Sequence, residues 1–162
     1  MPRADWGLNM NRLGLIVAML AAAALSGCGG AAPETVTVPV TIAAAANANP
    51  DASGRPSPVQ LQIYQLKSGA ALEQADYFKL SENAQAALGD SLVGSEQVVL
   101  APGKTQTVSL KLDPATRQLG VAAGFRDIDH ARWRALTPVD PERAGAVRIS
   151  VGPADVSIKA GE

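Results

Sequence analysis

The chain has 162 residues, of which 47% are hydrophobic and 18% are charged. With 14 basic and 15 acidic residues its formal net charge is −1, so it lacks the positive excess typical of proteins that bind nucleic acids or anionic lipids. It contains one cysteine, which leaves no partner for a disulfide within the chain, and a folded domain must therefore be stabilised by packing.

The N-terminal residues have the layout of a secretory signal peptide. Arg3 and Arg12 precede an apolar stretch over residues 13–25, which is shorter than the roughly 20 residues that a helix needs to cross a bilayer. The stretch ends in Leu25-Ser26-Gly27-Cys28, which resembles the bacterial lipobox, where small residues precede the cysteine that receives a lipid. We predict a cleaved lipoprotein signal peptide over residues 1–27 and lipidation of Cys28.

An uncleaved membrane anchor is the alternative, because the small residues 29–32 extend the apolar run. The position of the single cysteine at this boundary favours lipidation. Gly29 occupies the position that, in the enterobacterial sorting pattern, is an aspartate in lipoproteins retained at the inner membrane. By this resemblance we expect the chain to be lipid-anchored in the outer membrane, on its periplasmic face.

Residues 28–34 carry no apolar pattern and are expected to form a short lipidated tether to a domain over residues 35–162. Apolar and polar residues alternate over residues 36–42 and 59–66, as expected for two half-buried β-strands. Because Pro39 cannot donate a backbone hydrogen bond, we expect the first strand to lie at a sheet edge or to have a bulge there.

The segment of residues 43–58 contains three prolines and almost no large apolar residue. It is predicted to be a long loop that the core does not need, and loops of this length are usually functional or disordered. Its candidate partner-binding residues are Asn47, Asn49, Asp51, Ser53 and Arg55. A passive connector is the alternative, because the alanines here carry little binding information.

The hydrophobic period changes around residues 70–89, where one or two short helices are expected, with Ser81 as an N-cap and Gly89 as a stop. Pro102 and Gly103 suit the centre of a type II turn that joins two strands. Further strands are expected over residues 97–100, 105–112, 119–126, 133–137, 146–151 and 155–159. This pattern predicts an all-β sandwich of about eight antiparallel strands in two sheets, with a short helical insertion.

His130 is the only histidine, and its neighbours Asp127 and Asp129 raise the possibility of a metal site or a catalytic dyad. No second histidine accompanies it, and no serine lies in a G-x-S-x-G setting, so we expect no catalytic residue, no metal and no cofactor. Trp133 lies among charged residues that either contact a partner or, as we favour, tie a loop to the sandwich around a buried ring. The charged residues of this cluster are Arg126, Asp127, Asp129, Arg132 and Arg134.

Several segments, in this order, resemble the outer-membrane lipoproteins of bacterial type VI secretion systems, the TssJ family. They are residues 59–66 (VQLQIYQL), 78–80 (FKL), 84–89 (AQAALG), 100–103 (LAPG) and 124–134 (GFRDIDHARWR). The resemblance implies a transthyretin-like sandwich, anchored in the outer membrane and bound to the periplasmic domain of the large inner-membrane protein TssM. It also implies that the loop after the first strand meets this partner, although this loop is longer and richer in Ala and Asn than in many family members.

The leading hypothesis is therefore a non-enzymatic assembly component that binds no nucleic acid. The alternative is a periplasmic lipid-anchored small-ligand carrier, since transthyretin-like sandwiches can bind small molecules. A cell-wall hydrolase is disfavoured, because no cluster of His, Cys and acidic residues can be assembled from the sequence.

Overall fold

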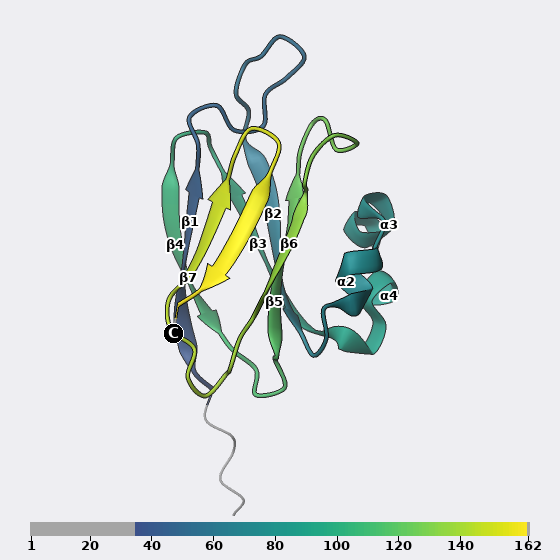
Figure 1. Cartoon of the computed structure of the whole chain (residues 1–162), viewed down its shortest axis with the longest axis vertical. Coiled ribbons are helices and arrows are strands. Elements are labelled where there is room, and N and C mark those ends of the chain that lie inside the picture. Colours follow the sequence, from purple (N-terminus) through teal and green to yellow (C-terminus); the bar gives the residue numbers. More distant parts are fainter. Residues whose placement is uncertain (1–34, 162) are drawn as a thin grey trace, which may run out of the picture. The chain divides into compact units, whose positions relative to one another are not determined.

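The computed structural model describes residues 35–161, which form eight β-strands in two sheets and a short helical segment (Figure 1). The predicted signal peptide, the lipidation site Cys28 and the tether of residues 28–34 lie outside the described residues. The strands are β1 (Thr37–Ala44), β2 (Val59–Leu66), β3 (Leu92–Leu100), β4 (Thr105–Lys111), β5 (Gln118–Gly124), β6 (Arg134–Pro138), β7 (Val147–Val151) and β8 (Val156–Ala160). The helices are α2 (Ala70–Gln74), α3 (Tyr77–Glu82), α4 (Ala84–Leu88) and the 3-10 turn η2 (Gly89–Ser91).

The first sheet has the strand order β4-β1-β7-β8 and the second has the order β3-β2-β5-β6. Their inner faces share one apolar core, to which alternating residues of the strands contribute, such as Val40 of β1 and Leu61 of β2. The predicted β-sandwich of eight strands in two sheets with a helical insertion is confirmed. The transthyretin-like relationship stays a prediction.

The position of β1 corrects two expectations. Strand β1 lies inside its sheet, between β4 and β7, and its pairing with β4 runs without a bulge. Pro39 is tolerated there because it is paired with Ser109 of β4, whereas the pairing with β7 begins only at Val40. The chain therefore needs no hydrogen-bond donor at Pro39 on the β7 side.

The pairing of β1 with β7 is parallel, whereas antiparallel strands were predicted. The other strand pairs within residues 35–161 are antiparallel. A parallel pair cannot be joined by a hairpin and needs a long crossover. Here the crossover contains β4 and the whole second sheet, so β1 and β7 meet only when the sandwich is assembled.

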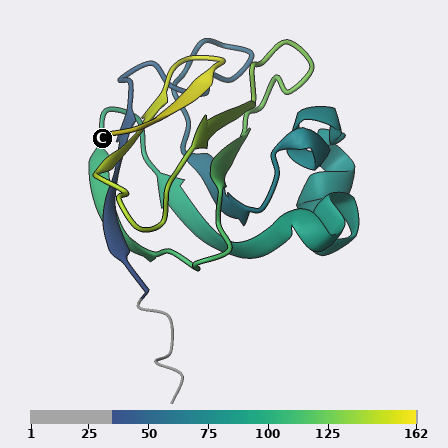
Figure 2. The same cartoon turned by 60° about the horizontal axis from the view of Figure 1, so that its bottom comes forward.

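The helical segment covers part of the outer face of the second sheet, as Figures 1 and 2 show. Leu72, Leu80 and Leu88, one from each helix, are buried against Tyr64 and Leu66 of β2. These residues form a second apolar cluster, separate from the core between the sheets. Each of these short helices has one buried residue, its leucine.

Helices α3 and α4 each have a polar side chain as N-cap. Neither N-cap is the predicted Ser81, which lies inside α3. The Asp76 carboxylate accepts a hydrogen bond from the Lys79 backbone N–H, and the Asn83 side-chain oxygen accepts one from the Ala86 N–H. The stop predicted at Gly89 is confirmed, since this residue ends α4 with a φ of 55°, which glycine adopts without strain.

Gln65 of β2 joins the two sheets at one end of the core. Its side chain is 8% exposed, and its Nε2 donates to the carbonyl oxygen of Lys111, the last residue of β4 (3.0 Å). Its Oε1 accepts from the Asp113 backbone N–H and from the hydroxyl of Thr116, a residue with no exposed surface (2.9 Å each). This one amide fixes the connection between β4 and β5.

We predict that Gln65→Met destabilises the domain by about 2 to 3 kcal/mol, because the thioether fills the space but leaves the Thr116 hydroxyl and nearby backbone groups unpaired. The control is Gln60→Met on the same strand, where the side chain is exposed. This control should change the free energy of unfolding by less than about 0.5 kcal/mol. Denaturant titration measures both, and equal midpoints for the two variants would contradict the role of Gln65.

Candidate functional site

Three connections meet at the end of the sandwich opposite to the start of β1 (Figure 1). They are the β1–β2 loop (residues 45–58), the β5–β6 loop (residues 125–133) and the β7–β8 turn (residues 152–155). The backbone N–H of Asn49 donates to the carbonyl oxygen of Pro153 (3.2 Å), which ties the first loop to the turn. We call this surface the loop end.

Asp51 organises the tip of the β1–β2 loop. Its Oδ1 accepts from the backbone N–H groups of Ser53 (2.9 Å) and Arg55 (3.0 Å), and its Oδ2 accepts from the Arg55 side chain (2.8 Å). These bonds hold the pKa of Asp51 below its ordinary value of 3.8, and the backbone N–H of Arg55 is the largest cause. The carboxylate therefore supports the folded tip at neutral pH, and acidification through its lowered pKa removes that support.

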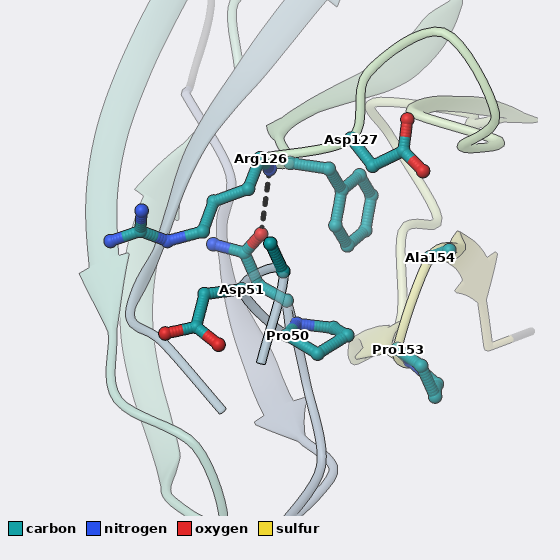
Figure 3. Close-up of a pocket in the computed structure, with 9 residues that line it drawn as sticks. Pro50, Asp51, Arg126, Asp127, Pro153 and Ala154 are labelled. Atoms are coloured by element: carbon teal, nitrogen blue, oxygen red, sulfur yellow. Dashed lines mark hydrogen bonds between the residues drawn. The ribbon is translucent and has the colours of Figure 1, made fainter. Parts of the chain in front are cut away.

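Asn49 is the residue that connects the β1–β2 loop to the β5–β6 loop. It is 2% exposed and has a φ of 50°, a left-handed conformation that asparagine tolerates better than most residues. Its Oδ1 accepts from the Arg126 backbone N–H (2.8 Å), which is the bond drawn in Figure 3, and its Nδ2 donates to the Pro58 carbonyl oxygen (2.7 Å).

The expectation that the core does not need this loop is wrong. Ala48 has no exposed surface and belongs to the core between the sheets, and Asn49 and Ser57 are also buried. Small residues reach the core here because the loop folds back over the end of the sandwich. The available sequence signal was the Asn49-Pro50 step, since asparagine before proline is typical of a structured turn.

The five predicted partner-binding residues divide by exposure. Asn47, Ser53 and Arg55 are exposed, Asp51 is half-buried and Asn49 is buried. Because both polar ends of the Asn49 amide are bonded within the chain, Asn49 shapes the surface and is not free to contact a partner. The other four residues stay predicted contacts.

A pocket of about 390 Å³ opens between the three connections (Figure 3). It is lined by Asn49, Pro50, Asp51, Ala52, Phe125, Arg126, Asp127, Pro153 and Ala154. Phe125 is buried beneath the loops, and the Arg126 side chain is held by a bond from its Nε to the Ser57 hydroxyl (3.0 Å). The pocket is large enough to receive a side chain from another molecule.

The charged cluster of the β5–β6 loop serves to hold local structure. His130 Nδ1 lies 2.8 Å from Asp127 Oδ1, both side chains are exposed, and this hydrogen bond is the main cause of the raised pKa of His130. Arg132 lies 3.7 Å from Asp155 in the β7–β8 turn. No serine hydroxyl bonds to His130 within residues 35–161, so the structure brings no nucleophile to the histidine.

Trp133 is half-buried between the two apolar clusters instead of enclosed in the core as predicted. Its ring packs edge-on against Tyr77 of α3, with centroids 5.2 Å apart, and the Arg134 guanidinium lies 4.6 Å above the ring. Arg134 also donates to the carbonyl oxygen of Ala75 (2.6 Å). These contacts attach the helical segment to the β5–β6 loop.

Within residues 35–161, no group of three or more His, Cys, Asp or Glu side chains is placed to hold a metal ion. In the same part of the chain, every helix is too short or too polar to cross a bilayer.

Residues 36–154 match the model of a family described as type VI secretion lipoprotein, VasD, EvfM, TssJ. The crystal structure of the type VI secretion system (T6SS) lipoprotein TssJ1 from Pseudomonas aeruginosa is similar, with 38% identity, a TM-score of 0.73 and coverage of 80% of this chain and 98% of that chain. A chain in a structure of a type VI membrane complex is 28% identical, with a TM-score of 0.65 and coverage of 80% and 100%.

A chain in a structure of the T6SS protein TssM C-terminal domain (869–1107) from EAEC is also 28% identical. Its TM-score is 0.61, and the alignment covers 78% of this chain and 98% of that chain. No protein with a curated description matches the sequence significantly.

We predict that Asn49→Ala destabilises the domain by about 2 to 4 kcal/mol, because it leaves two part-buried backbone groups without their partner and puts alanine at a positive φ. The matched control is Asn47→Ala in the same loop, where the side chain is exposed and the change should be below about 0.5 kcal/mol. Thermal or denaturant unfolding distinguishes the two variants. If Asn49→Ala unfolds at the same midpoint as the control, the loop is a passive connector.

Proposed function

Because the chain belongs to the family of type VI secretion lipoproteins, we propose that it is a non-enzymatic outer-membrane lipoprotein that binds the periplasmic domain of the large inner-membrane protein TssM. The family match over residues 36–154 carries this proposal and confirms the family recognised in the sequence. The similar chain found in a structure of a TssM C-terminal domain supports the choice of partner.

The membrane attachment proposed is a lipid on Cys28. The lipobox-like residues before Cys28 support it, as does the family description as lipoproteins. Two or three acyl chains bind a bilayer far more firmly than a single chain, because each buried methylene contributes about 0.8 kcal/mol. The absence of aspartate at position 29 supports the outer membrane as the destination.

The loop end lies at the opposite end of β1 from the first residue of that strand. The tether of residues 28–34 enters the domain at the start of β1, and the strand then runs eight residues to the β1–β2 loop. At about 3.3 Å per residue the strand spans about 25 Å. The loop end and the segment that leads to the proposed anchor therefore attach to opposite ends of β1.

The loop end has the properties of a prepared binding surface. Asp51 and Asn49 hold the β1–β2 loop in one conformation, so little entropy is lost when a partner binds. The exposed contact candidates are Asn47, Ser53 and Arg55, and the pocket beside them offers space for a partner side chain. The lone exposed His130 and its bond to Asp127 give no support for catalysis.

We predict that Cys28→Ser yields a folded protein that is not lipidated and no longer fractionates with the outer membrane. The sandwich should be unaffected, because residue 28 precedes the domain. Metabolic labelling with palmitate, followed by membrane fractionation, measures both effects. Continued labelling of the serine variant would refute the assignment of Cys28.

We predict that the triple variant Asn47→Ala, Ser53→Ala and Arg55→Ala weakens binding to the periplasmic domain of TssM by at least about tenfold, which corresponds to about 1.4 kcal/mol. Calorimetry measures the affinity. The melting temperature should stay nearly unchanged, since Ala48 and Asn49, which support the loop, remain.

The control is the triple variant Gln106→Ala, Ser109→Ala and Lys111→Ala at exposed residues of β4, which should bind normally. Unchanged affinity of the loop variant would exclude these side chains as contacts. Equal weakening of both variants would show that the partner does not select the loop end.

A further inference from the structure

A second, smaller pocket lies between the helical segment and the outer face of the second sheet, and it shares no residue with the pocket at the loop end. Its volume is about 100 Å³. Its lining residues are Gln60, Gln62, Tyr64, Tyr77, Leu80, Ser81, Ala84, Ser95, Ala122 and Gly124. None of these residues carries a charge, although 18% of the chain is charged. We call it the helix–sheet pocket.

The strand register explains the floor of this pocket. On the outer face of the sheet, Tyr64 of β2 lies beside Ser95 of β3. Gln62 and Gln60 lie beside Ala122 and Gly124 of β5. The small residues on β5 leave a depression, and helices α3 and α4 form its wall. A Cβ atom on residue 124 would lie 2.8 Å from the Tyr77 hydroxyl, so glycine is needed to keep this arrangement.

The Tyr64 hydroxyl faces the open space of the pocket. Tyr64 is 2% exposed as a residue, and its hydroxyl has no hydrogen-bond partner within residues 35–161. In that range, every side-chain N or O atom that is fully enclosed has a partner, so the Tyr64 hydroxyl is not fully enclosed. The hydroxyl is therefore reachable from the pocket. Burial raises the pKa of Tyr64 to about 12, so the group stays a neutral donor and acceptor. An occupant that displaces water from this hydroxyl without bonding to it would cost about 1 to 3 kcal/mol, so the site favours a polar occupant.

Other groups around the pocket are also positioned for hydrogen bonding. The Gln62 Nε2 donates to Gln97 Oε1 (2.9 Å), which fixes the amide and leaves the Gln62 Oε1 available as an acceptor. The Ser81 hydroxyl donates to the Phe78 carbonyl oxygen (3.0 Å) and retains its lone pairs. The lining also includes the apolar side chains of Leu80, Ala84 and Ala122.

These features select one chemical class of ligand. A charged group is disfavoured, because no lining residue compensates its charge. A purely apolar group would leave the Tyr64 hydroxyl unpaired. The space corresponds to about three water molecules at roughly 30 Å³ each, which is about the size of an acetamido group. Such a group offers a carbonyl oxygen to the Tyr64 hydroxyl, an N–H to the Gln62 oxygen and a methyl to the apolar side.

We propose that the helix–sheet pocket binds an acetamido group, such as that of an N-acetylated sugar. This site is independent of the partner surface at the loop end, and its failure would leave the proposed function intact.

The test uses ligand-observed saturation-transfer NMR with the full chain in detergent micelles and N-acetylglucosamine as the probe. We expect saturable binding in the millimolar range, with the strongest transfer to the acetyl methyl protons, and no comparable transfer to glucose. Tyr64→Phe removes one hydrogen bond while keeping the ring and should weaken binding about fivefold.

A matched pair of variants on α4 tests the position of the site. Ala84→Leu fills the pocket and should abolish binding, whereas Ala86→Leu makes the same change at an exposed residue outside the lining and should bind as the unmodified chain does. Absence of saturable binding would show that the pocket holds only water and would overturn the proposal. Binding that survives both Tyr64→Phe and Ala84→Leu, or equal binding of glucose, would overturn it as well.

Discussion

The second half of strand β2 is buried on both faces, and the rest of the structure is arranged to satisfy this constraint. Leu61 and Ile63 face the core between the sheets, whereas Tyr64 and Leu66 face the helical segment. A two-layer sandwich would leave the second pair of side chains in water, so the three short helices are needed as a partial third layer. Gln65, which follows Leu61 and Ile63 on the core-facing side of the strand, then binds the end of the other sheet. One strand thus fixes the positions of both apolar clusters.

The loop end depends on the sandwich through buried polar groups and not through apolar packing alone. Asn49 satisfies backbone groups on both its own loop and the β5–β6 loop, and Asp51 does the same within the loop tip. Buried amides of this kind are costly when they lose a partner, which makes the conformation specific. The surface is therefore rigid even though it contains few large side chains, and rigidity before binding is what a recognition surface needs.

The sequence predicted the strands well because apolar residues alternate along them, and that period follows directly from strand geometry. It could not show that Ala48 and Asn49 are buried, because small or polar residues in a loop carry no period. Pro39 led to the wrong prediction that β1 lies at a sheet edge or has a bulge. Proline is tolerated inside this sheet because the neighbouring strand β7 pairs with β1 only from the next residue onward. The parallel β1–β7 pair joins distant segments and leaves no local signal. The exposed candidates Asn47, Ser53 and Arg55 were predicted from resemblance and composition and stay predictions, whereas the pockets required the structure.

The place of β1 between β4 and β7 has a mechanical consequence. A pull between the proposed lipid anchor and a partner on the loop end would act along β1, from its first residue to its last. Hydrogen bonds to β4 run across the strand direction, so the part of this load that passes from β1 to its neighbours shears the whole ladder at once instead of opening it bond by bond. The bonds to β7 on the other side share the same load. A strand held on both sides in this way can transmit tension through the domain while the fold stays intact.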